Sequence, residues 1–136
     1  MIKAVSAANG QQEQQLLTAN CVIPGSKGLK QYSQLNLDKC LGWRRTNDGG
    51  GALVALKNGG GLSKKGGQCS KCRYLQSSPN LICNCAGVRQ DQKTYVDPAT
   101  ATWMGPVLFD LDAVLLSGKP LIEVTGQGLL ACHGVV

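Results

Sequence analysis

The chain has 136 residues, the length of one domain with a single modest core. Only 16% of the residues are charged and 4% are aromatic, while 18 are glycine, which excludes a long helical bundle or a coiled coil. The formal net charge is +6, yet no basic run exceeds two residues and no apolar stretch approaches the ~20 residues of a membrane span. We therefore expect no nucleic-acid or membrane partner, and we expect the seven cysteines to stabilise a core poor in aromatic side chains.

The first half of the chain predicts short strands separated by turns. Residues 16–23 alternate between apolar and polar side chains and end at Pro24, as a half-buried strand closed by a turn would. A second short strand is predicted over 52–56. It lies between 47–51 and 58–61, two segments of Asn, Asp and Gly that favour hairpin turns because these residues tolerate positive φ.

The second half repeats this plan. Residues 80–85 resemble 15–21, and residues 108–115 resemble 34–41, so each copy joins a strand ending in cysteine to a later Leu-Asp pair. The aspartates of these pairs, Asp38 and Asp112, are predicted to cap a single helical turn in each copy.

After the second helical turn, residues 117–120 predict a turn into a strand over 121–124. The repetition predicts an all-β, pseudo-symmetric domain of short antiparallel sheets and hairpins with short helical turns. We expect a single domain over residues 1–136, with repeat one at about 6–62, repeat two at about 63–124 and a C-terminal extension at 125–136.

Four cysteines bracket a predicted hairpin in the second half. Disulfides Cys69–Cys85 and Cys72–Cys83 suit facing antiparallel strands, with one bulge because three residues separate one pair and two the other. A zinc site of four thiolates is the alternative, although zinc sites usually take both pairs from C-x₂₋₄-C segments. The pairing of the remaining Cys21, Cys40 and Cys132 stays open.

Catalytic patterns are missing from the sequence. The single histidine, His133, follows Cys132 near the end of the chain, where we expect a solvated side chain and no Cys–His catalytic pair. The glycine- and lysine-rich segment 61–67 lacks the Gly-Lys-Ser/Thr of a phosphate-binding loop. We therefore expect no enzyme activity, no cofactor and no metal.

Three ordered motifs resemble the cyanovirin-N homology family, especially its fungal lectins. They are the strand 17–21 with its partner 81–85, the segment 35–42 with its partner 109–115, and the Gly- and Ser-containing segment 60–69. The resemblance covers about residues 6–124. It implies two modules, each a three-stranded sheet plus a hairpin, with the hairpin that opens each repeat packed in the other half.

The resemblance also implies a binding function. Members of the family bind oligosaccharides, typically mannose-type glycans, in shallow pockets near the two poles. One pocket would use residues 23–27 facing 116–118 and the start of the chain. The other would use the loop after Cys85 facing two turns of the first repeat, with these carbohydrate-binding residues: Asn47, Asp48, Asn58, Ser63, Gly87, Arg89 and Gln90.

We therefore expect a secreted, extracellular, disulfide-stabilised lectin that binds mannose- or glucose-type oligosaccharides. The alternative is a secreted interaction protein, for instance a fungal effector, that keeps the scaffold, has lost the sugar site and binds a host protein. The basic charge, the odd number of cysteines and the aromatic side chains of Trp43, Tyr95 and Trp103 motivate that alternative.

Overall fold

The computed structural model describes residues 2–7, 15–63, 65–74, 80–98, 101–134 and 136, the first of these ranges as backbone. This part of the chain is almost entirely strands and turns, so the predicted all-β fold with short helical turns is confirmed. The elements are β1 (Ile2–Ala7), β2 (Gln15–Val22), β3 (Lys30–Asn36), η1 (Leu37–Lys39), β4 (Leu41–Arg45), β5 (Gly51–Ala55), β6 (Cys69–Tyr74), β7 (Asn80–Cys85), η2 (Gln90–Gln92), β8 (Tyr95–Asp97), β9 (Thr102–Asp110), β10 (Ile122–Val124) and β11 (Leu130–Cys132).

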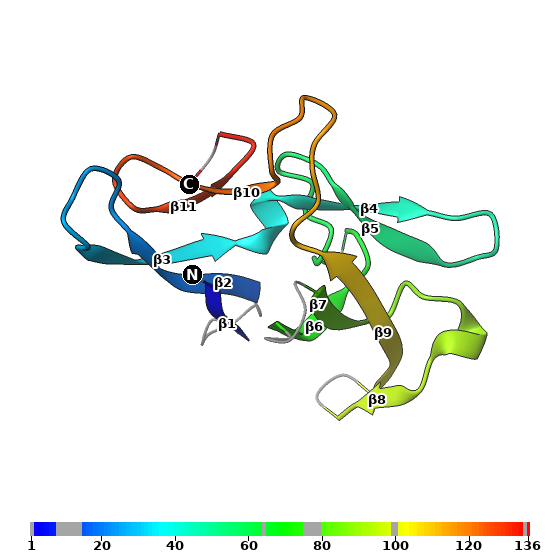
Figure 1. Ribbon diagram of the computed structural model, residues 1–136. Helices are drawn as coiled ribbons and strands as arrows, with labels where there is room; N and C mark the ends of the chain where they lie inside the picture. Colours follow the sequence, from blue (N-terminus) through cyan, green and yellow to red (C-terminus); the bar gives the residue numbers. More distant parts are fainter. Residues whose placement is uncertain (1, 8–14, 64, 75–79, 99–100, 135) are drawn as a thin grey trace.

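The strands form two sheets and two hairpins, and each half of the molecule contains one of each. The sheet β1-β2-β3 carries the hairpin β10–β11, which contacts β3, while the sheet β6-β7-β9-β8 carries the hairpin β4–β5, which contacts β9 (Figure 1). The hairpin that closes each half of the sequence therefore packs on the sheet of the other half. The resemblance had implied such an exchange for the opening hairpin.

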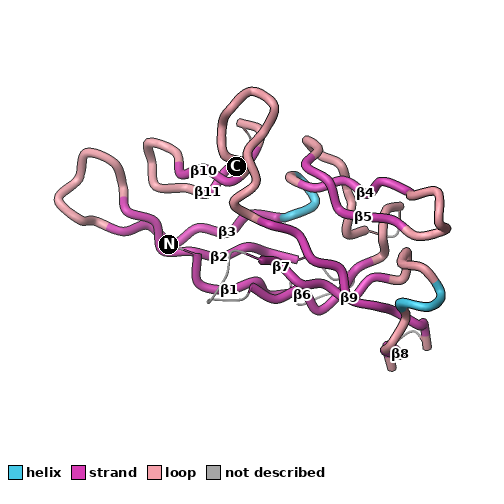
Figure 2. Tube along the Cα trace, turned by 45° about the vertical axis from the view of Figure 1, so that its right-hand side comes forward, coloured by secondary structure: helices cyan, strands magenta, loops and turns pink. Residues whose placement is uncertain are grey.

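The two sheets meet along β1 and β6 (Figure 2). At this junction the buried side chain of Gln15 accepts a hydrogen bond from the Cys72 amide, at 2.9 Å between Oε1 and N. A buried amide without a partner would be costly, so this bond helps to fix the register of the halves.

The helical turn predicted at Asp38 is present as η1, whereas the one predicted at Asp112 is a hydrogen-bonded turn and no helix, and in both the cap lies two residues before the predicted one. Asn36 Oδ1 accepts from the Asp38 amide at 3.0 Å, and Asp110 Oδ1 accepts from the Asp112 amide at 2.9 Å. The prediction that Asp38 and Asp112 act as caps is therefore wrong. Strands β3 and β9 end at Asn36 and Asp110, and the short side chain of each of these residues reaches the amide two residues further on. Asp38 instead accepts from the Leu62 amide at 2.8 Å.

The cysteine hairpin has the predicted register and both predicted disulfides, Cys69–Cys85 and Cys72–Cys83. The predicted bulge lies between Ser70 and Arg73, where Lys71 has a left-handed φ of 52°. The four sulfurs of this hairpin are thus bonded in pairs, which agrees with the disulfide interpretation. The zinc alternative would require four unbonded thiolates.

A third disulfide joins Cys40, after η1, to Cys132 in β11. Cys21 is the free cysteine and is 1% exposed. The register of β1 extends no further than Ile2 opposite Ala19, so no residue of β1 pairs with Cys21. The third disulfide ties the first repeat to the hairpin that crosses over to it.

The C-terminal segment belongs to the packed structure. Residues 125–136 provide β11, whose Cys132 pairs with Ile122 of β10, so the segment expected to extend the two repeats completes the second hairpin. His133 is half-buried with Nε2 3.0 Å from the Cys40 carbonyl oxygen, which corrects the expectation of a solvated side chain. The disulfide between Cys40 and Cys132 holds the histidine in this position.

Leucine and cystine fill the core where aromatic residues are scarce. The largest fully buried aliphatic side chains come from both halves: Leu17, Leu35, Leu37, Leu41, Leu81 and Leu121. Trp43, Tyr74 and Phe109 are partly buried against this cluster. The few aromatic rings therefore lie at the margin of the core, and one of them reaches a surface cavity.

Candidate functional site

A cavity of about 350 Å³ opens beside the β4–β5 hairpin, at the end of β4 and next to the loop that follows β7. Its volume is at the lower end of the range of roughly 300–1,000 Å³ for small-molecule sites. Side chains and backbone of both repeats line it: Trp43, Arg45, Thr46, Gly49, Gly50, Gly66, Ala86, Gly87, Val88 and Lys93.

Glycine residues seat the Trp43 indole in this cavity. A Cβ atom added at Gly51 would lie 2.2 Å from the indole Nε1, and one at Gly67 would lie 2.4 Å from Cε3. A Cβ at Gly87 would lie 2.8 Å from Cζ2. Real Cβ atoms do not approach so closely, so the ring position depends on backbone without side chains at all three positions.

Strand alternation selects which arginine of β4 reaches the cavity. Side chains two residues apart on a strand share a face, so Arg45 lies on the face of Trp43 and Arg44 on the opposite one. The cavity is accordingly lined by Trp43 and Arg45 and not by Arg44.

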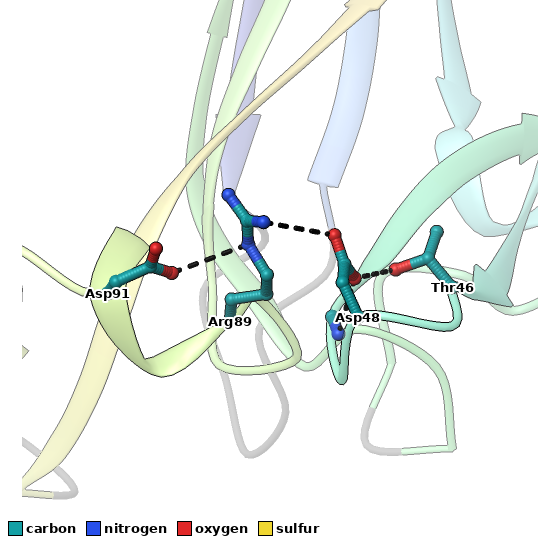
Figure 3. A network of polar contacts seen from close by, with 5 residues as sticks. Thr46, Asp48, Arg89 and Asp91 are labelled. Atoms are coloured by element: carbon teal, nitrogen blue, oxygen red, sulfur yellow. Dashed lines mark hydrogen bonds and ion pairs between the residues drawn. The ribbon is translucent and has the colours of Figure 1, made fainter.

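A network of polar contacts joins the β4–β5 turn to the loop after β7 (Figure 3). Arg89 Nη1 lies 3.2 Å from Asp48 Oδ2, and Arg89 Nε lies 3.3 Å from Asp91 Oδ1. The guanidinium thus lies between two carboxylates, one from each side (Figure 3). This arrangement holds Arg89 beside the cavity.

Asp48 is fixed within its own turn as well. The Thr46 hydroxyl donates to Asp48 Oδ1, and the Gly50 amide donates to the same oxygen at 3.1 Å. These two bonds, with the nearby Arg89 charge, lower the pKa of Asp48 below its ordinary value of 3.8. Asp48 is therefore ionised at neutral pH and presents carboxylate oxygens as acceptors.

The structure brings together only some of the predicted binding residues. Gly87 lines the cavity, while Asp48 and Arg89 form the ion pair next to it. Asn47 lies in the same turn as Asp48, and Gln90 begins η2 after Arg89; both are exposed.

Asn58 and Ser63 lie in a different turn and do not line the cavity. Asn58 has a left-handed φ of 51° and its amide donates to the Lys39 carbonyl at 2.9 Å. The Ser63 hydroxyl donates to the Gly60 carbonyl at 2.6 Å. Both residues shape the loop after β5 and contribute no side chain to the cavity.

Trp43, Arg45, Thr46 and Lys93 line the cavity although sequence reasoning did not place them there. The alternation of β4 after Leu41 would have put Trp43 and Arg45 on one face. Nothing in the sequence places Lys93 against β4, since that contact depends on the exchange of hairpins.

The first predicted pocket is arranged differently from the expectation. Residues 23–27 were expected to face 116–118, but Ile23 lies against the β10–β11 turn, where a Cβ at Gly128 would come 2.9 Å from Ile23 Cγ1. Leu116 is fully exposed. A cavity of about 390 Å³ does exist on this half, but it is lined by other residues: Tyr32, Ser33, Gln34, Leu129 and Val136.

The residues that the structure describes contain neither a cluster of metal-ligating side chains nor a membrane-spanning helix. Among these residues, no three His, Cys, Asp or Glu side chains are grouped as metal ligands usually are. Likewise, no helix in this part of the chain has the length and apolar character needed to cross a bilayer. Comparison of the chain with known protein families, curated proteins and solved structures found no match.

Proposed function

We propose that the protein is a carbohydrate-binding protein that takes mannose- or glucose-type oligosaccharides in the cavity beside Trp43. The observation that carries the proposal is the composition of this cavity. An indole supplies an apolar surface, and Arg45, Thr46 and Lys93 supply hydrogen-bond donors around it. A pyranose ring has apolar C–H faces and a rim of hydroxyls, and so matches both features.

The ion pair next to the cavity suits vicinal hydroxyl groups. Asp48 offers carboxylate acceptors, and Arg89 offers several N–H donors in a fixed plane 3.2 Å away. Both side chains keep partial exposure, 50% for Asp48 and 38% for Arg89, so a sugar can reach them. The resemblance to the cyanovirin-N homology lectins assigns the same two residues to a glycan pocket.

The proposal does not include catalysis. Among the described residues that line the cavity, none carries a carboxylate, an imidazole or a thiol, the groups most often used for proton transfer or nucleophilic attack. The three disulfides support a secreted, extracellular location, because such bonds form and persist in oxidising compartments.

A glycan array tests this proposal. Wild-type protein is compared with Arg89→Ala and with Arg44→Ala, which removes the same charge from the opposite face of β4. We expect wild type and Arg44→Ala to retain mannose- or glucose-type ligands and Arg89→Ala to lose them. Absence of glycan binding by the wild type at millimolar sugar would rule the proposal out.

One observation favours the alternative of a secreted interaction protein. Trp103 of β9 is 53% exposed and pairs across the hairpin with Val96 of β8, which is 39% exposed. Aromatic side chains of this kind are common anchors in protein interfaces. Capture of a host protein that free sugars do not displace, and that Trp103→Ala abolishes, would favour this function.

A further inference from the structure

The lining of the cavity beside Trp43 contains two cationic side chains. Arg45 and Lys93 both contribute to its lining, and no Asp or Glu does so among the described residues. The two nearest acids of the polar network, Asp48 and Asp91, are both paired with Arg89. With Arg89 this network carries a net charge of −1, which offsets only one of the two positive charges of Arg45 and Lys93.

Neither lining cation has an ion-pair partner within the part of the chain that the structure describes, where both ion pairs belong to Arg89. Arg45 projects from the end of β4, and Lys93 follows η2 in the other repeat. Two like charges from separate elements on one cavity repel each other. A bound anion would remove that repulsion and form charge-assisted hydrogen bonds with both.

We propose that the cavity selects saccharides bearing an anionic group, either a sulfate ester or the carboxylate of a uronic acid, with Arg45 and Lys93 as its contacts. This inference rests on the proposed carbohydrate-binding function and specifies the chemical class of the ligand. A neutral sugar desolvates both cations without offering them a countercharge, which weakens its binding relative to an anionic analogue. The Arg89–Asp48 pair then contacts neutral hydroxyls in both kinds of ligand.

The test compares three oligosaccharides that share one mannose- or glucose-type core: neutral, sulfated at one hydroxyl, and ending in a uronic acid. Their affinities for the wild type are measured by isothermal titration calorimetry at low and at physiological ionic strength. We expect at least one anionic ligand to bind about tenfold more tightly than the neutral one, with a preference that weakens as salt is added.

Two variants of equal net charge locate the effect. Arg45→Gln/Lys93→Gln should abolish the anionic preference, so that the anionic and the neutral ligands bind this variant with equal affinity. Arg44→Gln/Lys57→Gln removes the same charge from outside the cavity and should keep the preference, since Lys57 is exposed in the loop after β5. Circular dichroism and thermal unfolding confirm that each variant is folded.

The outcomes distinguish the preference for anionic saccharides from carbohydrate binding itself. Equal affinity for neutral and anionic ligands would overturn the inference and leave the proposed function standing. An equal loss of preference in both double variants would also overturn it, because attraction would then reflect net charge alone. Failure of every ligand to bind would contradict the proposed function itself.

Discussion

Arg89 Nη1 lies 3.2 Å from Asp48 Oδ2, and this ion pair joins the loop after β7 to the turn between β4 and β5. The ion pair therefore connects the β4–β5 hairpin of the first repeat to the second repeat, on whose sheet this hairpin packs. Both side chains are partly exposed, and exposed ion pairs contribute only about 0–1 kcal/mol to stability. The pair should matter more for the shape of the site than for the free energy of unfolding.

The pKa of Asp48 gives a first prediction. The Thr46 hydroxyl, the Gly50 amide and Arg89 lower this pKa in the folded protein, so the contribution of Asp48 to stability is present above its ordinary value of 3.8. It is lost as the pH falls through the lowered pKa. Asp48→Asn should therefore unfold at a lower temperature than wild type at pH 7, and the two melting curves should converge under acidic conditions. A difference that does not depend on pH would contradict this.

Asp38 is expected to show the opposite pH dependence. Partial burial raises its pKa, and the amide bond from Leu62 only partly offsets this. The protonated form is thus favoured in the folded state, with a contribution that is fully present below 3.8 and lost as the pH rises through the raised pKa. Asp38→Asn, which keeps an acceptor for the Leu62 amide, should be slightly more stable than wild type at pH 7.

Asp38→Ala is the matched comparison. It leaves the Leu62 amide without its acceptor and should lower the free energy of unfolding by about 1–2 kcal/mol. Urea unfolding of the two variants separates the hydrogen bond from the charge. Equal stability of the Asn and Ala variants would show that this bond contributes nothing.

The glycines around Trp43 are expected to be intolerant of substitution. A Cβ at Gly67 would meet the indole at 2.4 Å, so Gly67→Ala should cost about 1–3 kcal/mol and displace the ring. Gly126→Ala is the control, because nothing lies within 4 Å of the added atom. The tryptophan emission maximum should shift in the first variant only. An unchanged spectrum and stability for Gly67→Ala would refute the described seat of the indole.

The disulfide Cys40–Cys132 should dominate the coupling of the two halves. It closes a loop with a sequence separation of 92, and its removal in Cys40→Ala/Cys132→Ala should cost about 2–4 kcal/mol. Cys21→Ala removes a buried thiol without breaking a bond and should cost about 1 kcal/mol. Non-reducing peptide mapping should recover three disulfides and a free thiol at Cys21, and a peptide linking Cys21 to Cys132 would contradict this pairing.

Local features could be predicted well from the sequence. The Cys69–Cys85 and Cys72–Cys83 pairs follow from nearly constant index sums across a hairpin, and the unequal spacing implied the bulge at Lys71. The caps were assigned to the wrong residue because Asn36 and Asp38 are both good caps. Only the end point of β3 decides between them.

The cavity could be predicted only in part, because it forms between segments that are distant in sequence. Asp48 and Arg89 were expected to meet and do so. The position of Lys93 in the cavity and the pairing of Cys40 with Cys132 both depend on which hairpin packs on which sheet. Local sequence patterns do not determine that packing.

The central claim is that a saccharide binds beside Trp43, and a ¹H–¹⁵N NMR titration with a mannose-type oligosaccharide tests it most directly. The account predicts saturable shifts of the Trp43 indole N–H and of the Gly49, Gly50 and Gly87 amides, with little change at Tyr32 or Leu129 in the other cavity. An absence of shifts at millimolar sugar, or shifts confined to Tyr32 and Leu129, would contradict it.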